Sequence, residues 1–179
     1  IGFPGGKLVA LAIQNGAAVW EAPVASPKGT TELDRVADIV TVPVIDGRQI
    51  CAVAFQGRVA CFDMGQGGAL LWARDLSSAA GLAIDNRFVF VTDDRGAVHA
   101  LDRTSGASLW KQDKLLNRRV SGPAVQRGAV AVADGEGIVH FLSREDGSFV
   151  ARQKTDGSRV RTPVQAMGPG FLVQTTGGS

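Results

Sequence analysis

The sequence predicts an all-β protein, a β-propeller built from four-stranded blades. Glycine accounts for 23 of the 179 residues, about twice the usual share, which indicates many tight turns. Short runs of β-branched residues separate these turns, and no 3.6-residue period of the kind that helical arrays show is present. A turn-and-strand unit recurs about every 40 residues, which is typical of propeller blades.

The repeat is clearest between Gly96 and Trp110. A turn glycine begins an alternating strand that ends in Asp102, a four-residue turn closes on Gly106, and the next strand carries the tryptophan. Similar units begin at Gly6, Gly57 and Gly137, so successive starts are 51, 39 and 41 residues apart. Two of the three intervals agree closely, and the first is longer.

These units predict that the whole chain is part of a single β-propeller domain. The expected parts are a partial blade at 1–22, an inter-blade insert at 26–38, full blades at about 41–76, 82–113 and 122–155, and a partial blade at 161–179. Together they make about four blades' worth, open at both ends. A closed four-blade ring is rare, so half of a larger ring is expected. The first residue is Ile1 rather than Met, as expected of a processed or excised piece.

Charge and hydropathy argue against a nucleic-acid-binding groove and against a membrane-spanning helix. Lysines and arginines number 19 and acids 17, which gives a net charge of +2, and no basic run predicts a nucleic-acid groove. The longest apolar stretches have the length of strands and fall short of the ~20 residues that a membrane-spanning helix needs.

The two cysteines leave two possibilities open. Gln56-Gly57 resembles a two-residue hairpin turn. In that register Cys51 pairs near Phe62 and the two sulfurs point to opposite faces, which leaves two small buried residues. A three-residue loop would instead bring Cys51 opposite Cys61 and permit a disulfide.

The first interval between repeats hides an insert. Trp20 and Pro43 are 23 residues apart, whereas Trp110 and Pro123 are 13 apart, so about ten extra residues connect two blades. A repeat protein that lengthens one connection usually does so on its binding face. The alternative is a solvated loop that fills a gap between blades.

A short helix is expected within the insert, with Thr31 as its cap. One face would carry apolar residues at helical spacing, namely Leu33, Val36 and Ala37. Polar residues would project from the other face, namely Glu32, Arg35 and Asp38.

His99 and His140 occupy the same position in adjacent repeats. Two imidazoles on neighbouring blades could bind a metal, but no carboxylate is expected at the same level in both repeats. The favoured interpretation is two packed or half-exposed strand residues.

The run Ala100-Leu101-Asp102, Ser105-Gly106 and Trp110 resembles the tryptophan-docking motif of the quinoprotein propellers. In that family a small residue and a turn glycine let the tryptophan of one blade lie flat on its neighbour. The resemblance therefore implies that Trp20, Trp72 and Trp110 pack between blades.

A second resemblance covers nearly the whole chain and is to the BamB family. It rests on four segments, 31–38 (TELDRVAD), 54–60 (AFQGRVA), 109–112 (LWKQ) and 142–147 (LSREDG). This family consists of eight-bladed propellers of PQQ-like repeats without PQQ. They carry a lipid anchor on an N-terminal cysteine and face the periplasm at the outer membrane of Gram-negative bacteria. The present chain resembles the C-terminal half, which lacks the anchor.

The resemblance implies a non-enzymatic scaffold of the outer-membrane β-barrel assembly (BAM) complex. Its expected partners are the POTRA domains of BamA, which it would engage through the insert, with unfolded outer-membrane proteins as further candidates. The implied partner-binding residues are Glu32, Asp34, Arg35 and Asp38. Val40 stands where the family has a second acid.

An enzymatic alternative is a fragment of a PQQ-dependent quinoprotein dehydrogenase. Such enzymes use PQQ, a metal ion and a catalytic aspartate, and many carry a vicinal disulfide, whereas this chain has neither vicinal cysteines nor any tyrosine. No cofactor is therefore expected. Because four blades leave apolar faces and strand edges open, an isolated chain of these residues is also expected to self-associate, with an exchanged-blade homodimer as the favoured form. The alternative is that the missing strands belong to a longer chain.

Overall fold

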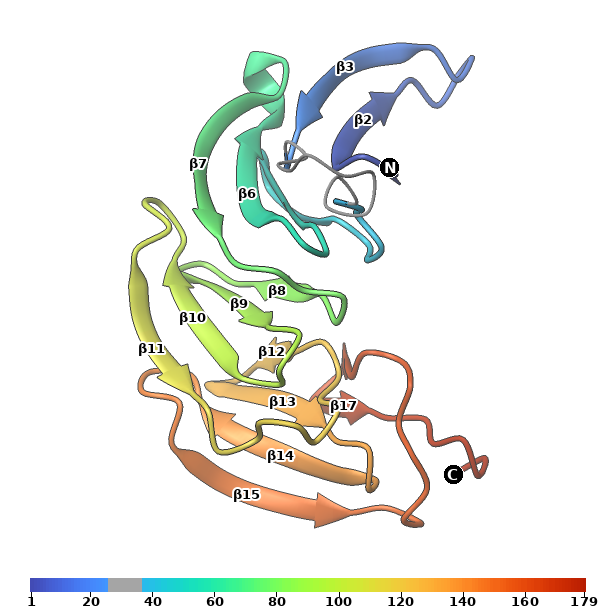
Figure 1. Cartoon of the computed structure of the whole chain (residues 1–179), viewed down its shortest axis with the longest axis vertical. Helices are drawn as coiled ribbons and strands as arrows, with labels where there is room; N and C mark the ends of the chain where they lie inside the picture. Colours follow the sequence, from blue (N-terminus) through green and yellow to red (C-terminus); the bar gives the residue numbers. More distant parts are fainter. Residues whose placement is uncertain (26–36) are drawn as a thin grey trace. The chain divides into compact units, whose positions relative to one another are not determined.

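A computed structural model describes residues 1–25 and 37–179 and shows an all-β chain, which confirms the predicted fold class (Figure 1). The described strands form five antiparallel sheets. The first sheet contains β1 (Gly2–Phe3), β2 (Lys7–Leu11) and β3 (Ala18–Pro23). The second contains β4 (Val44–Asp46), β5 (Gln49–Val53), β6 (Arg58–Asp63) and β7 (Ala69–Asp75).

The remaining sheets follow in chain order. The third contains β8 (Leu82–Ile84), β9 (Phe88–Thr92), β10 (Val98–Asp102) and β11 (Ser108–Gln112). The fourth contains β12 (Ala124–Gln126), β13 (Ala129–Ala133), β14 (Ile138–Ser143) and β15 (Phe149–Lys154), and the last β16 (Gln165–Met167) and β17 (Gly170–Leu172). In every sheet consecutive strands are hydrogen-bonded neighbours, so each is a meander as a propeller blade requires.

Helical structure contributes little to the described residues. A 3-10 turn, η2, spans Met64–Gln66, and Asp63 caps it by accepting a hydrogen bond from the Gly65 amide. None of the helices in the described part of the chain has the length and apolar content that a membrane crossing requires.

The chain separates into two compact units. The first consists of Ile1–Ala79 together with Thr104–Gly106, and the second of Ala80–Arg103 together with Ala107–Ser179. In the first unit, one apolar core joins the β1–β3 and β4–β7 sheets and includes Leu8, Ala22, Ile50 and Phe62. Burial of these side chains, rather than the short strand ladders, supplies most of the stabilisation between blades.

The second unit holds two further cores. One lies between the β8–β11 and β12–β15 sheets and contains Phe90, Val98, Val130 and Leu142. The other joins the β12–β15 sheet to the chain beyond it and contains residues such as Val164. The β12–β15 sheet presents a different apolar face to each of these cores, which explains why its central strands are buried on both sides.

Tryptophan rings lie on turn glycines at three places in the repeat. If Gly68, Gly106 and Gly147 carried a Cβ, that atom would lie 2.5 Å from Cε3 of Trp20, Trp72 and Trp110, respectively. All three glycines have positive φ values, of 78°, 71° and 70°. Glycine is therefore required at these positions both by the backbone conformation and by the ring that covers it. Trp72 is buried, and Trp20 and Trp110 are partly buried.

Two of these stacks are reinforced by a hydrogen bond to the same glycine. Arg74 donates to the carbonyl of Gly106 (3.2 Å), and Gln112 donates to the carbonyl of Gly147 (2.8 Å). Each donor follows its tryptophan by two residues. The ring and the donor thus lie on the same side of their strand and hold one turn between them.

A β-bulge interrupts the outer strand one residue before each tryptophan position. In the register of β2 with β3, Ala10 pairs with Trp20 and Leu11 with Ala18, so Val19 has no opposite residue. The same irregularity occurs in the other three sheets that have an outer strand, and the unopposed residues there are Leu71, Leu109 and Val150. All four side chains are exposed.

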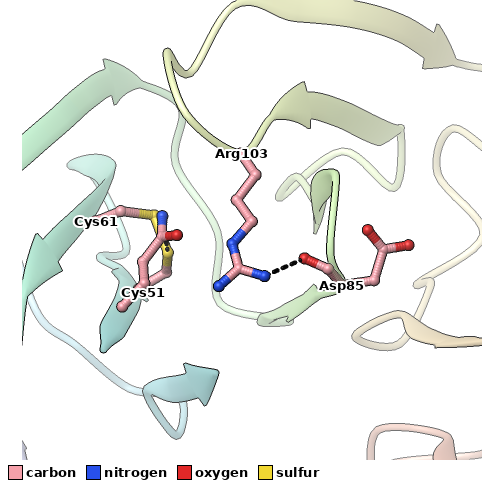
Figure 2. Close-up of a disulfide and its surroundings, with 5 residues drawn as sticks. Cys51, Cys61, Asp85 and Arg103 are labelled. Carbon is pink, nitrogen blue, oxygen red and sulfur yellow. Dashed lines mark hydrogen bonds between the residues drawn. A yellow bond between two sulfur atoms is a disulfide. The ribbon is translucent and has the colours of Figure 1, made fainter. Parts of the chain in front are cut away.

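The favoured hairpin register for the cysteines was wrong. β5 ends at Val53, the Ala54 amide donates to the carbonyl of Arg58 (3.1 Å), and three residues form the loop between them. Gln56, the middle residue of this loop, takes a positive φ of 51°. Cys51 consequently pairs with Cys61, and the two form a disulfide (Figure 2).

Candidate functional site

The end of the insert is fixed to the β1–β3 and β4–β7 sheets through Asp38. Its carbonyl accepts a hydrogen bond from the Phe55 amide (2.8 Å), and Oδ1 of its carboxylate accepts one from the Gly5 amide (2.9 Å). Asp38 thereby connects the β1–β2 turn with the β5–β6 loop, and its side chain is half-buried. The residue that the sequence assigns to partner binding also has a structural role.

The segment that follows Asp38 alternates between buried and exposed side chains. Ala37 and Ile39 belong to the core of the first unit. Val40 is 57% exposed and Val42 is 82% exposed. An extended chain places successive side chains on opposite sides, so the inward residues hold this segment while the outward ones present an apolar surface beside the Asp38 carboxylate.

The other three residues assigned to partner binding, Glu32, Asp34 and Arg35, lie outside the described residues, as does the helix expected after Thr31. The described structure therefore places one member of the predicted set, Asp38, and the exposed valines next to it. The sequence alone does not predict the exposure of Val40 and Val42, because nothing in it distinguishes exposed from buried valines in an irregular segment.

Two histidines are bound to aspartates from the turn that precedes them. Nε2 of His99 lies 2.8 Å from Oδ2 of Asp93, and Nε2 of His140 lies 2.9 Å from Oδ2 of Asp134. The expectation that no carboxylate lies at the same level in both repeats was wrong. Each turn folds back and brings an aspartate three residues before its glycine next to a histidine three residues after it, a spacing that the sequence shows in both repeats.

The aspartates also organise their turns. Oδ1 of Asp134 accepts hydrogen bonds from the amides of Glu136 and Ile138, and Oδ2 accepts one from Arg118 (2.8 Å). Burial raises the pKa of the Asp134 carboxyl, but the hydrogen bonds from His140, from the turn amides and from the guanidinium outweigh burial and bring the pKa below its ordinary value. Asp93 shows the same direction of pKa change, since burial is outweighed by bonds from His99 and two amides.

A second polar cluster joins the β8–β9 and β14–β15 turns. Arg144 pairs with Asp85 and Glu145 and lies over the ring of Phe88 at 4.6 Å. Arg103 donates to the Asp85 carbonyl (2.7 Å), as Figure 2 shows. Burial raises the pKa of the Asp85 carboxyl, but the bond from Arg144 and two amides lower it below its ordinary value. These mutual contacts indicate a fastening between blades.

The described residues contain no group of three or more histidine, cysteine or acidic side chains suited to a metal ion. Both histidines are engaged with single aspartates. Their surroundings are those of hydrogen-bonded strand residues.

Comparison with known proteins identifies the family. The model of the outer membrane protein assembly factor BamB family matches residues 1–112 and 94–178. The protein of that name from Bordetella pertussis is 48% identical over 178 residues, which cover 99% of this chain and 46% of the relative. The Escherichia coli K12 protein is 32% identical and covers 100% of this chain and 45% of its own length. The chain thus spans about half the length of these relatives.

Solved structures agree with this result. The crystal structure of BamB from Moraxella catarrhalis matches 97% of this chain and 51% of its own chain, with a TM-score of 0.90 and 29% identity. A europium-containing methanol dehydrogenase matches 64% of this chain and 24% of its own chain, with a TM-score of 0.55 and 23% identity, which shows a shared fold alone. The quinoprotein alternative is therefore not favoured. The sheets, the tryptophan stacks and the matching of the whole sequence together show that this chain belongs to the BamB family of outer membrane protein assembly factors.

Proposed function

We propose that this chain is part of a non-enzymatic binding subunit of the BAM complex at the periplasmic face of the outer membrane. In this function it binds the POTRA domains of BamA and assists the insertion of outer-membrane proteins. Family membership over almost the whole chain carries the proposal. The buried disulfide supports it, since stable disulfides are typical of oxidising compartments such as the bacterial periplasm.

The binding surface that we assign is the end of the insert, with Asp38 as its described member and Glu32, Asp34 and Arg35 as its further members. An anionic side chain flanked by exposed valines offers both charge complementarity and apolar area to a partner. Because Asp38 is hydrogen-bonded on both its carbonyl and its carboxylate, the surface around it is already ordered before binding.

Charge reversal at Asp38 tests this assignment. Asp38→Lys should weaken binding to the POTRA domains of the matching BamA by about 2 kcal/mol, or roughly 30-fold. Asp38→Asn removes the charge but retains an oxygen that can accept the hydrogen bond from the Gly5 amide. This variant therefore separates the effect of losing the charge from the effect of losing the hydrogen bond. Binding is measured by calorimetry, and thermal unfolding shows whether each variant is folded.

Glu21→Lys is the matched control, because it makes the same charge change on the exposed outer strand β3, where Glu21 pairs only weakly with Lys7. Its affinity should equal that of the parent. Equal affinities of parent and folded Asp38→Lys would remove Asp38 from the interface. Absence of binding by the parent chain would instead contradict the proposed partner.

Self-association of the isolated chain stays a prediction. β16 and β17 form a two-stranded sheet, two strands short of a four-stranded blade, so outer strands of a second chain could complete it. Its test is the molar mass of this 18.7 kDa chain in solution by light scattering.

A further inference from the structure

The disulfide lies in the centre of the β4–β7 sheet. Cys51 is on β5 and Cys61 on β6, their Cα atoms are 4.1 Å apart, and both side chains are 0% exposed. β4 pairs with the other edge of β5, and β7 pairs with the other edge of β6. The bond is therefore enclosed by backbone on both sides within its sheet.

The same rung of the neighbouring repeats shows that packing does not require cysteine there. The equivalent pairs, six residues before and four after the turn glycine, are Phe90 with Ala100 and Ala131 with Phe141. Each combines one large and one small apolar side chain. The β4–β7 sheet has instead two side chains whose common property is that they can be oxidised to a covalent bond.

Burial restricts when that bond can form. Thiol–disulfide exchange requires a third sulfur to approach one of the two sulfur atoms directly. A side chain with no exposed surface offers no such approach. Oxidation must therefore occur while the β5–β6 hairpin is still accessible, before the remaining strands and blades cover it.

The geometry also makes the bond selective for one strand register. Side chains alternate along a strand, so a shift of β6 by one residue would turn the Cys61 sulfur to the opposite face from that of Cys51. The loop sequence Phe55-Gln56-Gly57 resembles a turn that favours such a shifted register. Only the register with the three-residue loop places the two sulfurs together.

We propose that the unfolded chain is a substrate for thiol–disulfide exchange and that the Cys51–Cys61 bond fixes the β5–β6 register before the sheet closes. The oxidant is a small-molecule or protein disulfide. One cysteine thiolate attacks it, forms a mixed disulfide and releases the first oxidant thiol. The second cysteine thiolate then attacks that mixed disulfide, forms the Cys51–Cys61 bond and releases the second oxidant thiol. The chain loses two electrons and two protons, and the oxidant disulfide gains both.

The accessibility step is tested on the oxidised 179-residue chain. It is incubated with dithiothreitol in native buffer and in urea, free thiols are trapped with a maleimide, and added mass is measured over time. We expect reduction to be at least 100-fold slower in native buffer. A native rate within 10-fold of the rate in urea would overturn the proposed order of events, and a larger ratio would uphold it.

The register step is tested by refolding from urea with and without dithiothreitol. The parent should recover native circular dichroism at least 5-fold more slowly, or in at least 5-fold lower yield, when reduced. The control is Cys51→Phe/Cys61→Ala, which reproduces the Phe90–Ala100 pair and contains no thiol, so its refolding should not depend on dithiothreitol. A parent that refolds equally well in both conditions would overturn the register role. Failure of the control to fold would leave the parent comparison to decide.

Discussion

The β4–β7 and β12–β15 sheets have the same strand order, and each has a turn glycine covered by the tryptophan of the preceding sheet, but they are fastened differently. In the β4–β7 sheet a disulfide occupies the central rung, and the positions of the turn aspartate and the strand histidine are Ala54 and Ala60. In the β12–β15 sheet the rung is Ala131 with Phe141, and the turn is closed by Asp134 and His140. These two central hairpins are therefore fastened near the same turn by different chemistry.

The two fastenings respond to different conditions. A covalent bond between β5 and β6 depends on the redox state of the surroundings. The carboxylate–imidazole contact between the β13–β14 turn and β14 depends on ionisation and on exclusion of water. The predictions below separate these two dependences, from the largest expected effect to the smallest.

Asp134→Ala should cause the largest loss. The change removes a fully buried carboxylate and leaves His140, Arg118 and two turn amides without their acceptor, which should reduce the free energy of unfolding by about 3–5 kcal/mol. Chemical denaturation measures it. Glu136→Ala is the control in the same turn, since that carboxylate is 70% exposed and should contribute about 1 kcal/mol or less. Equal losses for the two variants would show that burial of the carboxylate does not matter.

Removal of the disulfide should have the next largest effect. Cys51→Ala/Cys61→Ala should reduce the free energy of unfolding by about 2–3 kcal/mol, because the bond closes a short loop and its loss also leaves a space in the sheet. Cys51→Ala/Cys61→Phe reproduces the apolar pair of the β12–β15 sheet and should recover part of this loss. If it is less stable than the double alanine variant, the two rungs are not interchangeable.

Gly147→Ala tests a feature that the two sheets share. Alanine at position 147 would have to adopt a positive φ, and its Cβ would also lie 2.5 Å from the ring of Trp110. The free energy of unfolding should therefore fall by about 1–3 kcal/mol more than for an alanine that meets only the positive φ. Gly128→Ala provides that reference, because Gly128 has a φ of 82° and no atom within 4 Å of its Cβ position. Equal thermal stabilities would exclude the tryptophan stack as the reason for glycine.

Acid should produce the smallest and most gradual effect. The pKa values of Asp93 and Asp134 lie below the ordinary value of about 3.9. Below that value the unfolded chain binds more protons than the folded one, so stability present at neutral pH is lost as the pH falls through the folded pKa values. Asp93→Asn/Asp134→Asn should show a shallower decline below about pH 4 in urea titrations at stepped pH. Parallel declines would assign the acid sensitivity to other carboxylates.

The sequence predicted the architecture well because its signals are local and repeated. The distance from turn glycine to tryptophan recurs, and in the structure each tryptophan contacts a turn glycine of the following repeat. The first tryptophan differs in one detail, since its ring lies on Gly68 rather than on Gly67, the glycine that closes the motif. An extra turn residue, accommodated by two consecutive glycines of positive φ, accounts for this difference.

The features that were missed depend on how loops fold. The length of the β5–β6 loop decided the cysteine pairing, and the dipeptide Gln56-Gly57 is compatible with either length. Likewise, the link between Asp134 and His140 exists only because the turn reverses the chain so that residues six apart meet. The spacing between repeats was enough to locate the insert that is assigned to partner binding. The structural role of Asp38 could not be predicted, because it depends on hydrogen bonds with Gly5 and Phe55 that only the structure shows.

The interrupted outer strands affect how many copies of this chain behave when crowded together. An uninterrupted edge of exposed aliphatic residues would offer neighbouring molecules a continuous ladder of amides and carbonyls, on which sheets could grow from chain to chain. At Val19, Leu71, Leu109 and Val150 the extra residue bends the strand and breaks that ladder into pieces only a few residues long. A strand added from a neighbouring molecule would lose its register at each of these points, so the bulges oppose edge-to-edge aggregation of the chain.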